Sequence, residues 1–227
     1  MHFFRLRSIS LTTVVLVMLA ISLLQEGVSY TTAYGPLDAF IPGLKHALLP
    51  TAWLIFRGVL MAIVIILWLL NRKWVLFKAI IVTNSVYTFG LFMNMVALVM
   101  VLFSFSSYAI RTLLGDVVLL VISNILIFSI WYWIIDPPGV DESARDDDPW
   151  DFLFPQRGDS LPHYESWMPR YTDYLYIAFT TSFAFSPTDS LPLTRRAKLL
   201  MLLQSTVSIV TLTAIAGSAI NILAGSI

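Results

Sequence analysis

Residues 172 to 198 read TDYLYIAFTTSFAFSPTDSLPLTRRAK, and this stretch decides how the rest of the chain can be arranged. It begins as a short aromatic helix, is interrupted at Pro187 and continues into a long hydrophobic segment. The helical part has about ten to fourteen residues, and even fourteen residues at ~1.5 Å each cannot cross a hydrocarbon core ~30 Å thick. A segment that stops partway through a membrane needs protein or a water-filled cavity to cover its backbone polar groups. The stretch therefore predicts a re-entrant loop.

The chain as a whole is strongly apolar. Of its 227 residues, 58% are hydrophobic and 12% are charged, and the mean hydropathy is +0.80. Long uninterrupted apolar blocks are typical of a polytopic α-helical membrane protein. The formal net charge is zero and the basic residues are scattered, so we expect the lipid bilayer and no nucleic acid as a partner. The chain has no cysteine, which excludes disulfides and thiolate metal sites.

We expect an all-α membrane protein with about five transmembrane helices and a re-entrant helix and loop before the last one. The first apolar block follows Arg5 and Arg7 and lacks a clear cleavage site after it, which favours an uncleaved helix over a signal peptide. Arg57 is expected to snorkel to the membrane surface. The predicted spans are 9–24, 51–70, 80–105, 116–135 and 198–223. The regions are 1–135 (four transmembrane helices), 136–170 (acidic, proline-containing loop) and 171–227 (short helix, filter-like loop and final helix).

Two regions carry polar residues that need an interpretation. In the third predicted span, a polar stripe favours hydrogen bonding between helices, with a substrate pathway as the alternative; it comprises Thr83, Asn84, Tyr87, Thr88 and Asn94. In the acidic loop, residues 146–148 could collect cations, but glycine-punctuated ligand spacing is missing, so a solvated loop is favoured. We expect no metal site, no cofactor and no enzymatic activity, because neither a histidine cluster nor a pair of intramembrane acids stands at catalytic spacing.

The last span carries a narrow polar stripe. Gln204, Ser208, Thr211 and Ser218 recur at helical spacing and so share one face. Such a face could line a wet axis between subunits, or it could form hydrogen bonds between helices of one bundle. The sequence leaves both interpretations open.

The stretch that opens this section resembles the pore module of the tetrameric pore-loop cation channels, most familiarly potassium channels. In that family a short helix rich in aromatics and threonines leads into a selectivity filter, an aspartate, and spaced proline, threonine and small-basic positions. The matching residues here are Asp189, Pro192, Thr194, Ala197 and Lys198, preceded by Tyr174, Tyr176, Phe179, Thr180 and Thr181. The resemblance extends over about residues 115 to 224, with its specific matches in some thirty of them.

The filter departs from the family's pattern. Ser186 and Thr188 stand where the two glycines of a potassium filter would fall, and Pro187 replaces an aromatic residue. Because β-carbons and a fixed proline φ oppose a carbonyl ladder, the resemblance implies a wider and more hydrated constriction. Hydroxyls of Ser182 and its neighbours and the Asp189 carboxylate would line it. The predicted site residues are Thr181, Ser182, Ser186, Pro187, Thr188 and Asp189, with Gln204, Ser208, Thr211 and Ser218 lining the pore below them.

Two functions fit this sequence. The first is a homo-oligomer, with a tetramer favoured, that passes small cations through a cell membrane with weak selectivity. The second is a non-conducting scaffold or accessory subunit that binds a partner through its re-entrant and acidic loops. With five spans, eleven basic residues share the side of the N-terminus against three on or near the other side, which predicts a cytoplasmic N-terminus. That orientation places the re-entrant loop on the cytoplasmic side, opposite to potassium channels.

Overall fold

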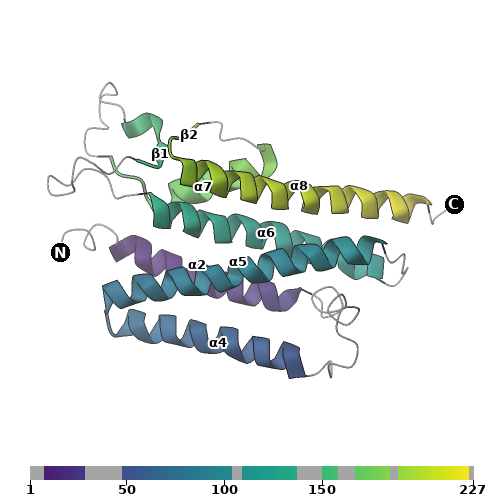
Figure 1. The fold of residues 1–227 in the computed structure, drawn as a ribbon, viewed down its shortest axis with the longest axis horizontal. Helices are drawn as coiled ribbons and strands as arrows, with labels where there is room; N and C mark the ends of the chain where they lie inside the picture. The colour runs from purple at the N-terminus through teal and green to yellow at the C-terminus, as the bar shows by residue number, and fades with distance from the viewer. Residues whose placement is uncertain are drawn as a thin grey trace.

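The computed structural model describes residues 8–28, 48–103, 109–136, 150–157, 167–184 and 189–224. Figure 1 shows these residues as an elongated bundle of helices lying side by side, with one short pair of strands at one end. The helices are α2 (Ser8–Gly27), α4 (Leu48–Leu69), α5 (Lys73–Phe103), α6 (Ala109–Ile135), α7 (Tyr171–Ala184) and α8 (Arg195–Ala224). The all-α class predicted from the sequence is confirmed for the part of the chain that the structure describes.

Four of these helices, α4, α5, α6 and α8, are long and apolar enough to cross a membrane, which indicates a multi-pass membrane protein. They coincide with four predicted spans, although all four begin earlier than expected, and α5 and α6 differ most. The early start of α5 follows from the tight turn after α4, in which Asn71 has a φ of 54°. Asparagine tolerates this left-handed conformation better than most residues, so α5 begins only two residues later, at Lys73.

The first predicted span is helix α2, and it packs against α4, α5 and α6. Val14, Met18 and Ile21 on this helix are each 0% exposed. Its apolar part, Leu11–Gly27, is shorter than the stretches of the four long helices. Whether α2 is a fifth span therefore stays a prediction, but its side chains form part of the core of the bundle.

Arg57 does not snorkel to a surface, contrary to the prediction. Its side chain is 6% exposed, and one guanidinium nitrogen lies 3.1 Å from a carboxylate oxygen of Glu26. The other terminal nitrogen donates to the carbonyl of Ser22 at 3.1 Å, and the guanidinium lies 5.6 Å from the centre of the Tyr87 ring. Charged groups inside a membrane pair with one another or with backbone carbonyls, and α2 supplies both kinds of partner within the bundle.

The polar stripe of the third predicted span lies on α5 and joins it to other helices. The side-chain amide of Asn84 donates to the carbonyl of Ile127 at 3.2 Å. The indole of Trp131 donates to the hydroxyl of Thr88 at 2.8 Å. The interpretation as interhelical hydrogen bonding is confirmed for Asn84 and Thr88.

Part of the acidic loop is folded against the helices rather than solvated. Strand β1 (Phe152–Leu153) pairs antiparallel with β2 (Leu191–Pro192), so that Phe152 stands opposite Pro192 and Leu153 opposite Leu191. Asp151 and Phe152 are each 0% exposed, and a short 3-10 turn follows at Pro155–Arg157. The expected solvated loop is therefore wrong for this segment. The triple aspartate at 146–148 lies outside the described residues.

Candidate functional site

Helix α7 is short because both of its ends are set by local sequence. At its start, the Asp173 carboxylate accepts a hydrogen bond at 2.6 Å from the backbone N–H of Arg170, as a capping carboxylate does three residues after a helix N-cap. The helix has 14 residues, which corresponds to about 21 Å and is less than the ~30 Å of a hydrocarbon core. The predicted short helix is therefore confirmed in position and length.

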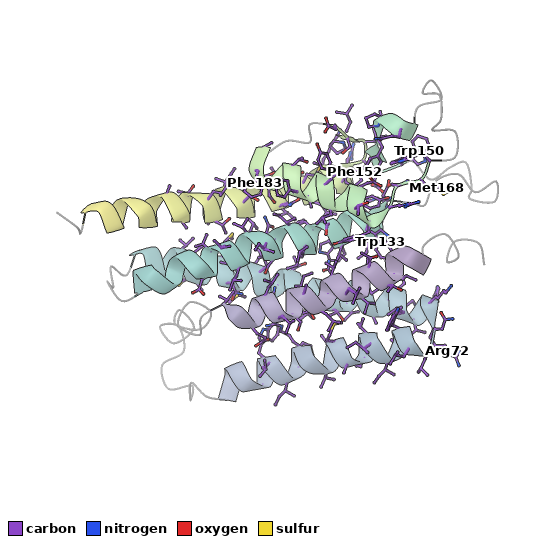
Figure 2. All side chains as sticks on the ribbon, turned by 180° about the vertical axis from the view of Figure 1, so that it is seen from behind. Arg72, Trp133, Trp150, Phe152, Met168 and Phe183 are labelled. Atoms are coloured by element: carbon purple, nitrogen blue, oxygen red, sulfur yellow. The ribbon has the colours of Figure 1, made fainter. Side chains whose placement is uncertain are left out.

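One face of α7 packs against α6 and α8. Its buried residues recur at helical spacing and are Tyr171, Tyr174, Ile177, Ala178, Thr181 and Ser182. The opposite face is aromatic and open, with Tyr176, Phe179 and Phe183 each about half exposed. In Figure 2, α7 starts at the end of the bundle where Trp150, Phe152 and Met168 lie and runs inward along the bundle to Phe183.

After α7 the chain comes back to the end at which the helix began. The hydroxyl of Tyr176, near the middle of α7, donates to a carboxylate oxygen of Asp189 at 2.5 Å. Two residues later β2 joins the loop strand β1, and α8 begins beside it. Asp189 is exposed and Ser190 is buried. This arrangement puts an exposed carboxylate at the point where the chain returns.

The predicted filter residues fall into three groups. Thr181 and Ser182 are each 1% exposed, so their side chains face the interior of the bundle. Asp189 is exposed. Ser186, Pro187 and Thr188 lie outside the described residues, and the constriction expected from them is untested.

Gln204 joins α8 to both of the helices that pack against it here. It is 0% exposed. Its side-chain nitrogen donates to the carbonyl of Ala178 at 2.7 Å and lies 2.8 Å from the hydroxyl of Ser182. Its side-chain oxygen accepts a hydrogen bond from the hydroxyl of Tyr132 on α6. One amide thus links α6, α7 and α8 at the depth where α7 approaches its end.

The rest of the polar stripe on α8 is buried as well. The amide of Asn124 on α6 donates to the hydroxyl of Ser208 at 2.8 Å. Thr211 is 0% exposed and donates to the carbonyl of Val207 at 2.9 Å. These contacts support hydrogen bonding within one chain and not the pore-lining role. Ser218 lies on α8, but the structure does not describe its side chain.

An ion pair between a buried aspartate and a half-exposed arginine holds the loop segment on the start of α8. The carboxylate of Asp151 accepts two hydrogen bonds from the Arg196 guanidinium, from Nε at 2.7 Å and from Nη2 at 2.6 Å. It also accepts one from the hydroxyl of Thr194. Thr194 in turn accepts a hydrogen bond from the backbone N–H of Ala197 at 3.3 Å, which makes it the N-cap of α8. The same guanidinium reaches the carbonyl of Ile135 at 3.3 Å, so the pair also holds the end of α6.

A second buried carboxylate, Asp136, fixes the start of α7. It is 0% exposed. One of its oxygens accepts the backbone N–H groups of Asp151 at 3.0 Å and Phe152 at 3.3 Å. The other accepts the hydroxyl of Tyr174 on α7 at 2.7 Å. The ring of Phe152 packs between Tyr132 and Tyr174, with ring centres 5.2 and 6.5 Å away. The loop, α6 and α7 therefore meet at one carboxylate.

Sequence reasoning missed the residues that hold this region together. In the sequence, Asp136 directly follows an apolar span and Asp151 belongs to an acidic segment. Tyr132 and Asn124 lie within that apolar span, and nothing near them in the sequence indicates their partners. The one signal in the sequence is the position of Asp136 beside an apolar span, because an aspartate that is buried there must be paired. The sequence does not show the partner, Tyr174, which lies 38 positions further along the chain.

Among the described residues, no group of three or more histidine, cysteine, aspartate or glutamate side chains is placed to hold a metal ion. What the site offers chemically is an exposed carboxylate at a returning loop, supported by a buried hydrogen-bond network. Comparisons with protein-family models, curated proteins and solved structures found no match to this chain.

Proposed function

We propose that residues 115–224 form a pore-loop module, through which a homo-oligomer of this chain passes small cations across a cell membrane. Four copies are favoured by the resemblance. The ion path runs past the segment from Thr181 to Asp189, and selectivity is weak because Ser186, Pro187 and Thr188 do not supply the glycine backbone of a carbonyl filter. The membrane is the plasma membrane or a bacterial inner membrane.

The observation that carries this proposal is the return of the chain beside α7. A helix of 14 residues runs inward from one end of the bundle, and the hydrogen bond from Tyr176 to Asp189 places the later residue back beside the middle of that helix. Irregular backbone at membrane depth is stable only where protein or a water-filled cavity covers it. A cavity that is shared between copies of the chain meets this requirement and brings several Asp189 carboxylates together, which attracts cations.

The face of α8 that lines the path in this proposal is the one that the chain leaves uncovered. Thr206 and Thr213 are exposed on that face, as is Leu202 at 63%. Gln204 and Ser208 lie on the covered side and bond to α6 and α7. Their role is to hold the module together, which differs from the pore-lining role expected from the sequence.

The end of the bundle that carries the loop faces the cytoplasm in this proposal. The start of α2, the turn between α4 and α5, the end of α6 and the start of α8 all lie there (Figure 1). The exposed cations Arg72, Lys78, Arg170, Arg195 and Lys198 belong to these segments or to the start of α7. Basic residues concentrate on the cytoplasmic side of membrane proteins.

A non-conducting scaffold is the second candidate, and one observation favours it. The side chains of Gln204, Ser208 and Thr211 on α8 are buried within a single chain, and the Asp151–Arg196 pair fastens the loop segment to the same helix. A module so closely held within one copy could serve as a rigid platform for a partner. A flux measurement separates the two candidates.

The test is cation flux into proteoliposomes that contain the purified protein. We expect Asp189→Asn and Ser186→Leu each to lower the flux at least severalfold. Asp173→Asn is the matched control, because it removes one negative charge at the same end while asparagine still accepts the capping hydrogen bond; its flux should equal that of the wild type. Undetectable wild-type flux with several cations and both membrane polarities would reject conduction and favour the scaffold.

The path along α8 can be mapped in the same preparation, because the chain has no cysteine of its own. Thr206→Cys and Thr213→Cys should react with a water-soluble, membrane-impermeant thiosulfonate and lose flux. Ser208→Cys, on the covered face, should not react. The reverse pattern would return the polar stripe to the role of a pore lining.

A further inference from the structure

The turn between α4 and α5, together with the first two turns of α5, carries three cations at the loop end of the bundle. Arg72 and Lys78 are exposed and Lys73 is partly exposed. Within the described residues none of the three forms an ion pair, in contrast to Arg57 and Arg196. Figure 2 shows Arg72 at the tip of the turn. These three cations therefore have no anionic partner among the described residues.

The side chains around these cations are apolar and equally exposed. Leu69 is 68% exposed, Leu70 63%, Trp74 60% and Val75 47%. Leucine and valine at a membrane-facing helix end contact acyl chains, and tryptophan concentrates at the level of the headgroups. Apolar side chains beside a tryptophan and basic residues are the combination that occurs where a helix leaves the hydrocarbon for the headgroup region.

The side chain of Lys78 is oriented by a contact with a neighbouring aromatic ring. It belongs to the outward-facing side of α5, where Val75 is 47% and Val82 54% exposed. Its ammonium lies 3.4 Å from the centre of the Trp74 ring, and Trp74 is one helical turn nearer the end of the bundle. The indole holds the ammonium up toward the headgroup level by a cation–π contact. The contact thus keeps the Lys78 ammonium beside Trp74, which follows Arg72 by two residues in the chain.

We propose that this turn binds the headgroup of an anionic phospholipid, with its phosphate held by Arg72, Lys73 and Lys78. Arginine and lysine form charge-assisted hydrogen bonds to phosphate oxygens, and clustered basic residues beside a membrane span attract anionic lipids. The exposed leucines and the indole ring receive the acyl chains and the glycerol region, which a free anion or an acidic peptide would leave uncovered. The site is separate from the pore-loop region and stands whether or not the protein conducts.

The experiment is native mass spectrometry of the detergent-solubilised full chain, titrated with phosphatidylglycerol or phosphatidylcholine. We expect the wild type to retain phosphatidylglycerol preferentially. Lys78→Gln and Arg72→Gln should each lower its affinity about fivefold, the typical effect of one cation at a membrane surface, and leave phosphatidylcholine unchanged. Trp74→Leu keeps every charge and removes the ring that positions Lys78, so a smaller loss of phosphatidylglycerol affinity is expected.

Arg170→Gln is the control, because Arg170 is an exposed cation at the same end of the bundle but belongs to another segment. Equal losses in Arg170→Gln and Lys78→Gln would show an effect of net charge alone and overturn the proposal, as would full phosphatidylglycerol binding by the Arg72→Gln/Lys78→Gln double variant.

Replacing the three aspartates 146–148 by asparagine should change the phosphatidylglycerol affinity little. A tenfold gain in that variant would mean that the chain's own acidic loop occupies the turn, which also overturns the proposal.

Discussion

The contact between Asp151 and Arg196 gives the sharpest prediction for the stability of the loop region. Asp151 is 0% exposed, whereas the Arg196 side chain is 57% exposed. Replacing Arg196 by alanine removes both of its hydrogen bonds to a carboxylate that has no access to water, and leaves the hydroxyl of Thr194 as a remaining donor. Replacing Asp151 by asparagine leaves an arginine that water can solvate.

The expected changes in the free energy of unfolding follow from this difference in exposure between the two side chains. Removing one partner of a buried ion pair typically costs 3–5 kcal/mol, and the half-exposed arginine lets water reach the vacated position, so we expect about 2–3 kcal/mol for Arg196→Ala. Arg196→Lys keeps the charge but cannot form the bidentate pair of hydrogen bonds to the carboxylate, and should lower the free energy of unfolding by about 1 kcal/mol. In an Asp151→Asn background the alanine substitution should cost below about 1 kcal/mol, so the double-mutant cycle should give a coupling of about 2 kcal/mol.

The assay is unfolding by dodecyl sulfate in mixed micelles, followed by far-ultraviolet circular dichroism. Hydrogen exchange at the amides of Asp151 and Phe152 detects local release of the segment, because both amides donate to Asp136. Arg195→Ala is the control, since this neighbouring arginine is exposed, and it should change stability by less than about 0.5 kcal/mol. Additive effects in the cycle, or unchanged amide exchange in Arg196→Ala, would refute the reasoning.

Two further predictions concern polar contacts inside the bundle. Gln204→Leu leaves the buried hydroxyls of Tyr132 and Ser182 without their amide partner and should cost about 2 kcal/mol in the same unfolding assay; a cost near zero would mean that water replaces the amide. Glu26→Ala leaves the buried guanidinium of Arg57 without its carboxylate and should destabilise the protein by about 1–2 kcal/mol, whereas Arg57→Met, which removes the buried charge, should cost less. The Glu26→Ala/Arg57→Met double variant should then be more stable than Glu26→Ala, and the opposite order would show that the pair is not what joins α2 to α4.

The helices were predictable because their signal is local. Length and apolarity along the chain determine a span, and the four long helices satisfy both conditions. The start of α7 is local too, since Asp173 caps it from three residues away. The start of α5 differs from the predicted one, because the prediction followed the apolar block from position 80 whereas the helix begins at Lys73. In fact the helix extends beyond the apolar block, and the ammonium of Lys78 rests on the ring of Trp74.

The contacts of the site were not predictable, because their partners are far apart in sequence. A polar stripe on α8 shows that Gln204 needs a partner, but not whether the partner belongs to the same chain. Likewise, the pairing of Asp151 with Arg196 spans 45 positions, and a run of acidic residues favours solvent when it is considered alone. The partner of Arg57 is also distant in sequence, because Glu26 lies on α2 whereas Arg57 lies on α4.

The buried polar groups also explain how so short a helix is held at one depth. Contact with lipid does not discriminate one apolar surface from another, so interhelical hydrogen bonds specify the position of a helix in a membrane. Helix α7 has such bonds near both ends. Near its start Tyr174 donates to Asp136 at 2.7 Å and the Tyr171 hydroxyl lies 2.6 Å from that of Ser129; toward its end Gln204 donates to Ser182 and Ala178 at 2.8 and 2.7 Å. Loss of the bonds at either end would leave α7 held at the other end only. Substitutions at Gln204 or Asp136 should therefore disturb the loop that follows α7 more than substitutions of the open residues Phe179 and Phe183.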